Sequence, residues 1–409
     1  MKKQKKTILI LGAGTDQVFI IRTAKKMGLR VIVIDKNEKS PGFKEADFAF
    51  QESTRSIEKI FSILDKFMKE EGEIHGVSTM GSDIPHIVAT IADYLNTPSI
   101  SKNTGELATN KFEMKKQFIK HGVYTPSFIL ANNPQEIINA FKKLGNQLVI
   151  KPLDQAGSRG VSLIDKSSDI TKLWKNALEN SRSDIVIVEQ FLKGPQISTE
   201  SIVYDGRIYT PGFADRNYDD LETYLPQIME NGGWVPSLYN KKKEIIEKEV
   251  LRAANSIGLM RGVVKGDVVL TDNGPAIIEI AARLSGGDFS ESLVPLGIGV
   301  NYVETVIRLA LGEDPKLNEL EKKFDKTVAN RYFFAPEGIL KQIKGIECVK
   351  SKPWVAKLQF WYEIGQRLPK INSHGSRSGV FVVVGENRKL VQERINWVYE
   401  KIEFVIEDF

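Results

Sequence analysis

The first 35 residues contain a pattern that few folds can accommodate. A short apolar run over 7–11 is followed at once by Gly12-Ala13-Gly14, and apolar residues then recur near helical spacing up to Met27. A second apolar run, over 31–34, ends at Asp35. A strand, a helix and a strand of this kind build a parallel sheet, whose strands are apolar throughout because helices cover both faces. The sequence therefore predicts a Rossmann-like α/β domain at the N-terminus.

The rest of the chain first repeats this pattern and then departs from it. Strands and helices alternate to about residue 100, so residues 1–100 are expected to form the first domain. A lysine-rich helix and short strands then open a smaller α/β unit, and longer strands joined by turns such as Asp272-Asn273-Gly274 predict antiparallel pairing. Towards the end, a strand at Gly379 to Val384 precedes an amphipathic helix that we expect over Leu390 to Val405. The whole chain is therefore expected to combine α/β and α+β architecture.

Composition narrows the classes of function. The 57 lysines and arginines exceed the 52 aspartates and glutamates by only five, so charge does not indicate nucleic-acid binding. A single cysteine, Cys348, excludes a disulfide framework and a multi-cysteine metal site, and it indicates a reducing compartment. No stretch reaches the roughly 18 apolar residues that a membrane span needs, and the run over 7–11 is too short for a signal peptide. We therefore expect a cytoplasmic protein without a nucleic-acid or membrane partner.

The glycines after the first strand are the first candidate binding element. Gly12 and Gly14 open a helix and Asp35 ends the second strand, as in a dinucleotide-binding fingerprint. The third glycine of that fingerprint would lie three residues after Gly14, where this chain has Gln17. Three interpretations stay open: a tight turn of an ordinary doubly wound sheet, a small-molecule site at the sheet edge, and NAD binding in an oxidoreductase.

A lysine and a glycine-rich loop form the second candidate. Lys151 ends a strand, and the chain returns into another strand through Gly157, Ser158, Arg159 and Gly160. One ammonium group and several backbone N–H groups in such a loop can surround a polyphosphate. By itself, the pattern is equally typical of a β-hairpin with an exposed lysine.

The third candidate is the end of the apolar strand that begins near residue 185. This strand ends in Glu189-Gln190-Phe191-Leu192 and leads through Lys193-Gly194-Pro195 into the next strand. Backbone groups at such a hinge can pair with an adenine edge, while Glu189 or Gln196 can accept hydrogen bonds from an exocyclic amine or a ribose hydroxyl. A strand end that contacts only solvent is the alternative.

Two carboxylates mark the fourth candidate. Asp267 and Glu279 lie on two expected strands joined by a tight turn, which places them opposite or near one another across the ladder. Like charges in this position are unfavourable unless a cation lies between them, and two carboxylates with phosphate oxygens and water suit Mg²⁺. Arg283, four residues after Glu279, can meet a phosphate or a carboxylate with two parallel hydrogen bonds. The alternative is a pair of solvated charges, which the apolar neighbours of Glu279 disfavour.

Taken together and in this order, these segments resemble the ATP-grasp superfamily. Each motif is unspecific by itself, but their ordered combination covers essentially the whole chain, because such enzymes also carry an N-terminal Rossmann-like domain. The resemblance implies an ATP-grasp domain over 101–312 with a lid subdomain at about 123–187, and a β-rich C-terminal domain over 313–409. The matching residues are Asn110-Lys111, Lys151-Pro152, the loop 157–161, the run 188–192 with Gly194, the loop 230–237, Asp267, Glu279, Arg283, Gly286 and Gly287.

The resemblance also implies a role for each matching residue. The phosphates would contact two lysines, the glycine-rich loop would cover them, a hinge would hold the adenine, and a polar residue would approach the ribose. Two carboxylates would hold Mg²⁺, or Mn²⁺ in its place, and an arginine with one of the lysines would stabilise the transferred phosphoryl group. The lysines are Lys111 and Lys151, the loop is Gly157, Ser158, Arg159 and Gly160, and the hinge is Glu189, Gln190, Phe191 and Leu192. The residue near the ribose is Gln196, the carboxylates are Asp267 and Glu279, and the arginine, which would act with Lys151, is Arg283.

Two positions depart from the pattern of the superfamily. Ala281 stands two residues after the second metal-binding carboxylate, where Asn is frequent, so one ligand or hydrogen bond to a second magnesium ion is missing or comes from elsewhere. Gln196 stands on the ribose side, where an acid is usual, and it keeps an acceptor but loses the charge. Glu200, four residues later on the same strand face, is expected to compensate.

The activity that the resemblance implies is ATP-dependent ligation of a carboxylate to an amine. ATP would convert the carboxylate to an acyl phosphate, and the amine would then displace phosphate, so that ADP and phosphate are released. The small-molecule substrates would be recognised by loops, among them 79–83, and Arg377 would reach the site from the C-terminal domain. Several related enzymes dimerise, which leaves a homodimer open.

Three other functions stay open at this point. One is a bicarbonate-activating carboxylase of the biotin-carboxylase or purine type. The second is the NAD-dependent oxidoreductase, and the third is a nucleotide-binding module without turnover. Gln17 argues against the oxidoreductase, and the retained Asp267, Glu279 and Arg283 argue against the module.

Overall fold

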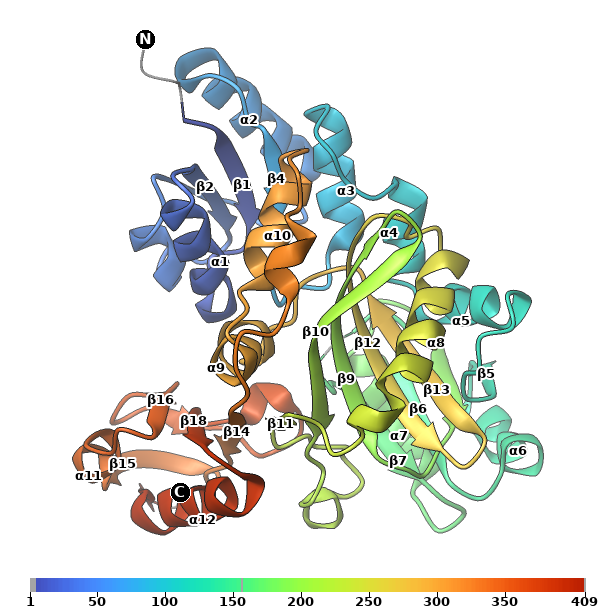
Figure 1. Ribbon diagram of the computed structural model, residues 1–409. Coiled ribbons are helices and arrows are strands. Elements are labelled where there is room, and N and C mark those ends of the chain that lie inside the picture. The colour runs from blue at the N-terminus through green and yellow to red at the C-terminus, as the bar shows by residue number, and fades with distance from the viewer. Residues whose placement is uncertain (1–4, 156, 408–409) are drawn as a thin grey trace.

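The N-terminal part of the chain forms a parallel sheet with strand order β3-β2-β1-β4, which confirms the predicted Rossmann-like unit (Figure 1). The computed structural model describes residues 5–155 and 157–407. The elements of this unit are β1 (Thr7–Leu11), α1 (Thr15–Lys26), β2 (Arg30–Asp35), β3 (Phe48–Gln51), α2 (Ile57–Glu71), β4 (Gly76–Ser78) and α3 (Pro85–Tyr94).

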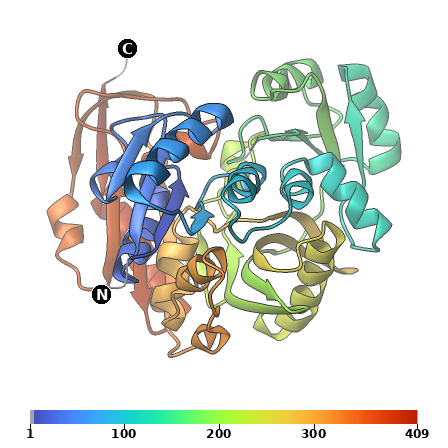
Figure 2. The same cartoon turned by 90° about the horizontal axis from the view of Figure 1, so that it is seen from above.

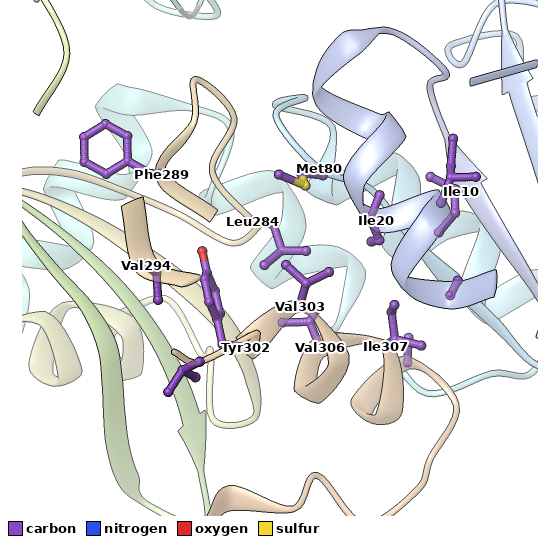
Figure 3. Close-up of a cluster of buried hydrophobic side chains, with 14 of the residues drawn as sticks. Ile10, Ile20, Met80, Leu284, Phe289, Val294, Tyr302, Val303, Val306 and Ile307 are labelled. Carbon is purple, nitrogen blue, oxygen red and sulfur yellow. The ribbon is translucent and has the colours of Figure 1, made fainter. Parts of the chain in front are cut away.

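One face of this sheet is covered by a helix from much later in the chain. In a strand, neighbouring side chains point to opposite faces, so Leu9 packs with the residues of α2 and α3 while Ile10 packs with α1. The same cluster contains α10 (Tyr302–Ala310), which lies beside β4 and α1, and α9 (Val294–Ile298) precedes it (Figure 1). Figure 3 shows Val303 and Ile307 of α10 on the side that faces Ile10 and Ile20. The first domain is therefore completed by residues far outside 1–100.

The predicted lid subdomain is a four-stranded antiparallel sheet with strand order β5-β8-β6-β7. Two helices pack on it through apolar side chains such as Ile137 of α6 and Leu173 of α7. Seen from above, this sheet lies on the side of the molecule away from the N-terminal unit (Figure 2). The elements from the end of the first unit onward are α4 (Lys102–Leu107), α5 (Lys111–Lys120), β5 (Phe128–Ala131), α6 (Pro134–Leu144), β6 (Leu148–Pro152), β7 (Ser162–Ile164), α7 (Ile170–Glu179) and β8 (Val186–Gln190).

An eight-stranded sheet joins the middle of the chain to its C-terminal part. Its order is β13-β12-β9-β10-β11-β14-β18-β16, and the predicted antiparallel pairing of β9, β12 and β13 is confirmed. Because β11 pairs with β14, the sheet runs without interruption across residue 312, where we placed a domain boundary. The strands, with helix α8 packed against them, are β9 (Gln196–Tyr204), β10 (Arg207–Arg216), β11 (Gly233–Val235), α8 (Lys243–Ser256), β12 (Gly262–Thr271), β13 (Gly274–Ala281), β14 (Thr327–Phe333), β16 (Val355–Phe360) and β18 (Gly379–Gly385).

The helix predicted over 390–405 is wrong in its last turn. Helix α12 (Arg388–Lys401) ends at residue 401, and Ile402 is already extended, with φ −90° and ψ 118°. The chain continues as β19 (Glu403–Glu407), which pairs antiparallel with β15 (Gly338–Lys344). The β-branched and aromatic residues of 404–406 favour a strand, and the Phe404 ring packs 5.5 Å from that of Phe333. The remaining elements are β17 (Arg367–Leu368), which also pairs with β15, and α11 (Ile346–Lys350).

Among the helices of residues 5–155 and 157–407, none is both long and apolar enough to cross a bilayer.

Candidate active site

Lys111, the first predicted phosphate ligand, is fixed by the start of α5. The N-cap residue Asn110 accepts two backbone N–H groups of the first turn at 3.1 Å, which anchors that end of the helix. Lys111 Nζ donates to the carbonyl of Gln155 at 2.7 Å and lies 3.6 Å from Glu279 Oε2. Lys111 therefore links the lid, through Gln155, to the strand that carries the second predicted metal ligand.

The carboxylate of Glu189 has two ammonium groups as neighbours. Lys151 on β6 pairs with Ile187 in the ladder, so it is a diagonal neighbour of Glu189 on β8 and shares its sheet face. Lys151 Nζ lies 2.9 Å from Glu189 Oε2, and Lys115 Nζ approaches the same oxygen at 3.4 Å. Burial by itself would raise the pKa of Glu189, but Lys115 and Lys151 outweigh it and lower that pKa. The side chain of Glu189 is thus already engaged, and its predicted contact with adenine stays a prediction.

Lys115 is a candidate that the sequence analysis did not single out. Its side chain is only 2% exposed, and burial lowers its pKa to about 8 even though Glu189 opposes that shift. It lies one helical turn after Lys111, on the face of α5 that buries Met114 and Phe118. Its position on the apolar face of a helix is the signal that could have identified it. A lysine is almost never buried unless it is paired, so a lysine on such a face indicates a buried carboxylate partner.

The glycine-rich loop turns tightly and is docked on the rest of the molecule. Gly157 and Gly160 have φ of +68° and +67°, and a Cβ at Gly160 would lie 2.9 Å from Pro152. The next strand of the lid contacts the 217–232 loop, because the Leu163 N–H donates to the carbonyl of Pro226 at 2.7 Å. The lid therefore contacts the loop between β10 and β11 of the large sheet.

The predicted adenine hinge lies at the end of β8. The N–H groups of Gln190 and Phe191 donate to the carbonyls of Ser127 at 2.8 Å and Gln147 at 3.1 Å, which extends the lid sheet by two hydrogen bonds. Leu192 and Gln196 are half-buried beside them. Gly194 has φ +145°, and a Cβ there would lie 2.3 Å from the carbonyl oxygen of Leu270 on β12, so this turn needs a glycine.

The two predicted metal ligands face each other. Asp267 of β12 and Glu279 of β13 are direct partners in the ladder, next to a β-bulge, as the sequence predicted. Cationic side chains surround them: Asp267 Oδ1 lies 2.7 Å from Arg216 Nη1 and also accepts from Lys265. Burial would raise the pKa of Asp267, but Arg216 and Lys265 lower it strongly. Lys265 is also the ladder partner of Ala281, so the two side chains lie on the same face of the sheet.

The donor set fits Mg²⁺. In the part of the chain that the structure describes, no three His, Cys, Asp or Glu side chains are arranged to hold a metal ion. Two carboxylates on neighbouring strands are nevertheless enough for Mg²⁺ when phosphate oxygens and water complete its shell. Asp267 and Glu279 are such a pair, and the side chain of Glu279 is 36% exposed.

Arg283 meets a carboxylate of the N-terminal domain. The two parts of the chain are joined by a parallel bridge between Met80 and Leu284, and the Gly81 N–H donates to the carbonyl of Leu284 at 3.0 Å. This brings Arg283 Nε to 2.7 Å from Asp83 Oδ1. Burial lowers the pKa of Arg283, but Asp83 raises it beyond its ordinary value. The 79–83 segment therefore contributes an acid to the site.

Glu200 does not compensate for Gln196, which corrects our expectation. Its carboxylate is buried and accepts from Ser285 and from the Tyr302 hydroxyl, the latter at 2.7 Å. Both partners lie towards the N-terminal domain. Burial raises the pKa of Glu200. The correction arises because partners across the domain junction, not strand spacing, determine the environment of Glu200.

The turn after the first strand is packed by a side chain of the following helix. The side chain of Gln17 fills the space beside the glycines of this turn: a Cβ on Gly12 or Gly14 would lie 3.1 Å from its atoms, and its amide donates to the carbonyl of Met80. Asp35 accepts from the N–H of Ala13 at 2.8 Å, which holds the turn. These contacts favour the interpretation as an ordinary turn of a doubly wound sheet over NAD binding.

The C-terminal part contributes Arg377 and His374. Arg377 Nη2 donates to the carbonyl of Glu230 at 2.6 Å, and Glu230 Oε2 in turn accepts from Arg216. Burial and Arg377 lower the pKa of His374, whose neutral Nε2 accepts from the Glu230 N–H at 3.3 Å. The His374 N–H donates to the carbonyl of Gly157 at 3.1 Å. Residues 374–377 thus connect the glycine-rich loop to the side chains around Asp267.

Comparison with known proteins assigns two regions of the chain to families. Residues 108–287 match the ATP-grasp domain, and residues 331–407 match the L-amino acid ligase C-terminal domain 2. A phosphoribosylamine–glycine ligase of Methanococcus maripaludis is 23% identical over 428 residues, covering 95% of this chain and 93% of its own.

Solved structures share the fold over the whole chain. The L-amino acid ligase from Bacillus licheniformis superposes with a TM-score of 0.83 at 20% identity and full coverage of both chains. The phosphoribosylglycinamide synthetase from Anaerococcus prevotii gives a TM-score of 0.75 at 22% identity, covering 99% of this chain and 100% of that one. The motifs and the shared fold agree with both matches: the chain contains an ATP-grasp domain and an L-amino acid ligase C-terminal domain, and it is an ATP-dependent ligase whose cofactors are ATP and Mg²⁺.

Proposed function

We propose that this ligase joins amino acids: it activates the carboxylate of one amino acid with ATP and transfers the acyl group to the amine of a second small molecule. The observation that carries the proposal is the partly buried pair of Arg283 and Asp83, 2.7 Å apart, next to the strands that carry Asp267 and Glu279. The match of residues 331–407 to an L-amino acid ligase domain supports the same class of substrate.

An α-amino acid is a zwitterion, and this pair has the complementary charges. A guanidinium group binds a carboxylate with two parallel hydrogen bonds, and a carboxylate accepts from an ammonium group. Arg283 follows Glu279 by four residues, so a substrate carboxylate on Arg283 would lie near the nucleotide. Asp83 would hold the α-ammonium group of the same molecule from the opposite side. The geometry therefore favours a substrate that carries both charges over bicarbonate, which has no ammonium group.

The nucleotide would bind between the lid and the large sheet. Its phosphates would contact Lys111 and Lys151 under the 157–160 loop, its adenine would lie against the hinge 189–192, and its ribose would approach Gln196. Asp267 and Glu279 would hold Mg²⁺, which supplies charge neutralisation of the phosphate oxygens when it is bound.

The reaction has two steps. In the first, a carboxylate oxygen attacks the γ-phosphorus, the bond to the bridging oxygen breaks, and ADP leaves with that electron pair. In the second, the amine, after its ammonium form loses a proton, attacks the carbonyl carbon, and the C–O bond to phosphate breaks. Lys111, Lys151 and Arg283 stabilise charge in the first step, and the docked lid keeps water from the acyl phosphate.

Substrate-dependent formation of ADP tests this proposal. ADP release is measured with Mg²⁺ across pairs of amino acids and amines, and separately with bicarbonate. Turnover is expected to require one amino acid and one amine, and Lys151→Ala and Glu279→Ala are expected to abolish it. Lys116→Ala is the control, because that side chain is 52% exposed and its partners, Glu113 and the Phe112 ring, lie on the same helix.

Four results would contradict the proposal or one of its residue assignments. Release of AMP and pyrophosphate would exclude the acyl phosphate, as would the absence of positional isotope exchange between bridging and non-bridging oxygens of ATP. Turnover that depends on bicarbonate would instead identify a carboxylase. Full activity of Lys151→Ala would remove that lysine from the phosphate site.

A further inference from the structure

Lys115 and Lys151 approach the same oxygen atom of one buried carboxylate. Glu189 Oε2 lies 2.9 Å from Lys151 Nζ and 3.4 Å from Lys115 Nζ. Glu189 Oε1 is buried and has no hydrogen-bond partner among the residues described. Both lysine side chains are largely shielded from solvent: that of Lys151 is 12% exposed and that of Lys115 is 2% exposed. One carboxylate thus balances two cations in the interior of the protein.

Binding of a nucleotide would weaken the contact between Lys151 and Glu189. In the function proposed above, Lys151 contacts a phosphate, and an ammonium group that turns towards phosphate weakens its pair with Glu189. A buried carboxylate without a partner is strongly unfavourable, so Glu189 by itself would hold Lys151 back. A second cation on the same oxygen removes this conflict.

Contacts other than Glu189 hold the ammonium group of Lys115 in place. Its Nζ donates to Thr125 Oγ1 at 3.0 Å, and the Thr125 hydroxyl donates in turn to the carbonyl of Ile277 at 2.8 Å. The Phe128 ring lies 5.8 Å from the ammonium group. These contacts come from the segment after α5, from β5 and from β13, so the ammonium group is held from several sides, whereas Lys151 has Glu189 as its hydrogen-bond partner.

We propose that Lys115 is a positioning residue for ATP binding: it is the permanent counter-ion of Glu189, and its presence allows Lys151 to turn from Glu189 to the nucleotide phosphate. This inference rests on the phosphate-binding role proposed for Lys151. Lys115 acts through Glu189 and Lys151 and does not itself contact the nucleotide.

The first test measures binding of a non-hydrolysable ATP analogue with Mg²⁺ by calorimetry. Lys115→Met is expected to raise the Kd about tenfold, which corresponds to about 1.4 kcal/mol, because it removes a hydrogen bond to a charged group. The KM for ATP is expected to rise with it, while kcat at saturating ATP changes much less. Lys115→Arg is expected to restore most of the affinity, and Lys116→Met is the matched control on the exposed face of α5.

The second test separates positioning from simple packing. In a Glu189→Gln background no carboxylate competes for Lys151, so adding Lys115→Met is expected to change the Kd far less than it does in the wild type. Thermal unfolding of every variant reports whether it is folded. Equal Kd values for the wild type and Lys115→Met, or effects of the two substitutions that simply add, would overturn the inference.

A pH profile provides an independent readout. Lys115 faces Glu189, Lys151 and Glu279, and its pKa of about 8 means that it loses its charge above that pH. The Kd of the wild type is therefore expected to rise above pH 8, and that of Lys115→Arg to rise less, because arginine keeps its charge. Identical profiles would contradict the inference. A wild type that does not bind the analogue at any pH would instead contradict the proposed function itself.

Discussion

Arg216, at the end of β10, provides a stringent test of the energetics. Arg216 joins two buried carboxylates, with contacts of 2.7 Å to Asp267 and 2.5 Å to Glu230, and the three side chains are 13%, 12% and 6% exposed. Arg216→Met would leave both acids without this partner. Removing one member of a buried ion pair costs about 3–5 kcal/mol. Asp267 keeps Lys265, whereas Glu230 keeps only Arg377 at 3.8 Å, so we expect the lower end of this range.

Urea unfolding followed by circular dichroism measures this loss. A decrease of about 3 kcal/mol corresponds to a midpoint lower by about 1 M urea or more, given slopes of about 1–3 kcal/mol per molar. The matched control is Arg22→Met, which removes a contact of similar length, 2.6 Å to Glu45, between exposed side chains. That variant should show little change, because solvent screens exposed pairs. Equal shifts of the two variants would refute the argument that burial determines the cost.

Three further changes have definite expected outcomes. Gly194→Ala should lower the unfolding temperature more than Gly206→Ala does, because both glycines have positive φ but only Gly194 lies against a neighbouring backbone; equal losses would contradict this. Burial raises the pKa of Glu200 above 4.5, so the free energy of unfolding should fall as pH rises from that value towards the raised pKa. Glu200→Gln should remove this slope in urea titrations at several pH values, and an unchanged slope would exclude Glu200 as its source. Arg283→Lys should lower kcat/KM on the order of 100-fold, because lysine keeps the charge but lacks the two parallel donors, and near-normal kcat/KM would contradict a bidentate role.

Local patterns predicted most of the elements near the site. The apolar runs at 7–11 and 31–34 and the glycines between them are enough to specify a strand, a turn and a second strand, because burial on both faces requires continuous apolar sequence. The turn Asp272-Asn273-Gly274 likewise fixed the pairing of β12 with β13, and hence the meeting of Asp267 with Glu279. The helix error at 402–405 has the opposite cause, since the partner of that segment, β15, lies some sixty residues earlier.

The contacts that give the candidate site its charges could not be predicted in this way. Asp83 and Arg283 are 200 residues apart, and nothing in either local sequence names the other. Lys115 carries the same charge as its neighbours on a lysine-rich helix, and only the packing of α5 against the lid sheet buries it beside Glu189. Glu200 lies on the strand face that the spacing predicts, but its carboxylate is hydrogen-bonded to Ser285 and Tyr302.

The sequence by itself determined most of the strands and helices and which residues are candidates for chemistry, because those properties follow from periodicity and turn preferences within some twenty residues. The tertiary structure decided which elements lie together: α10 covers the first sheet, β11 continues into β14, and acids and bases meet across domain junctions. The physical reason is that any apolar surface of suitable shape can bury the apolar face of a helix or strand. The sequence pattern therefore shows that such a face must be covered, but it does not identify the element that covers it. Charge then depends on that choice, since the same lysine is a solvated group on an open helix and a counter-ion once the helix is packed.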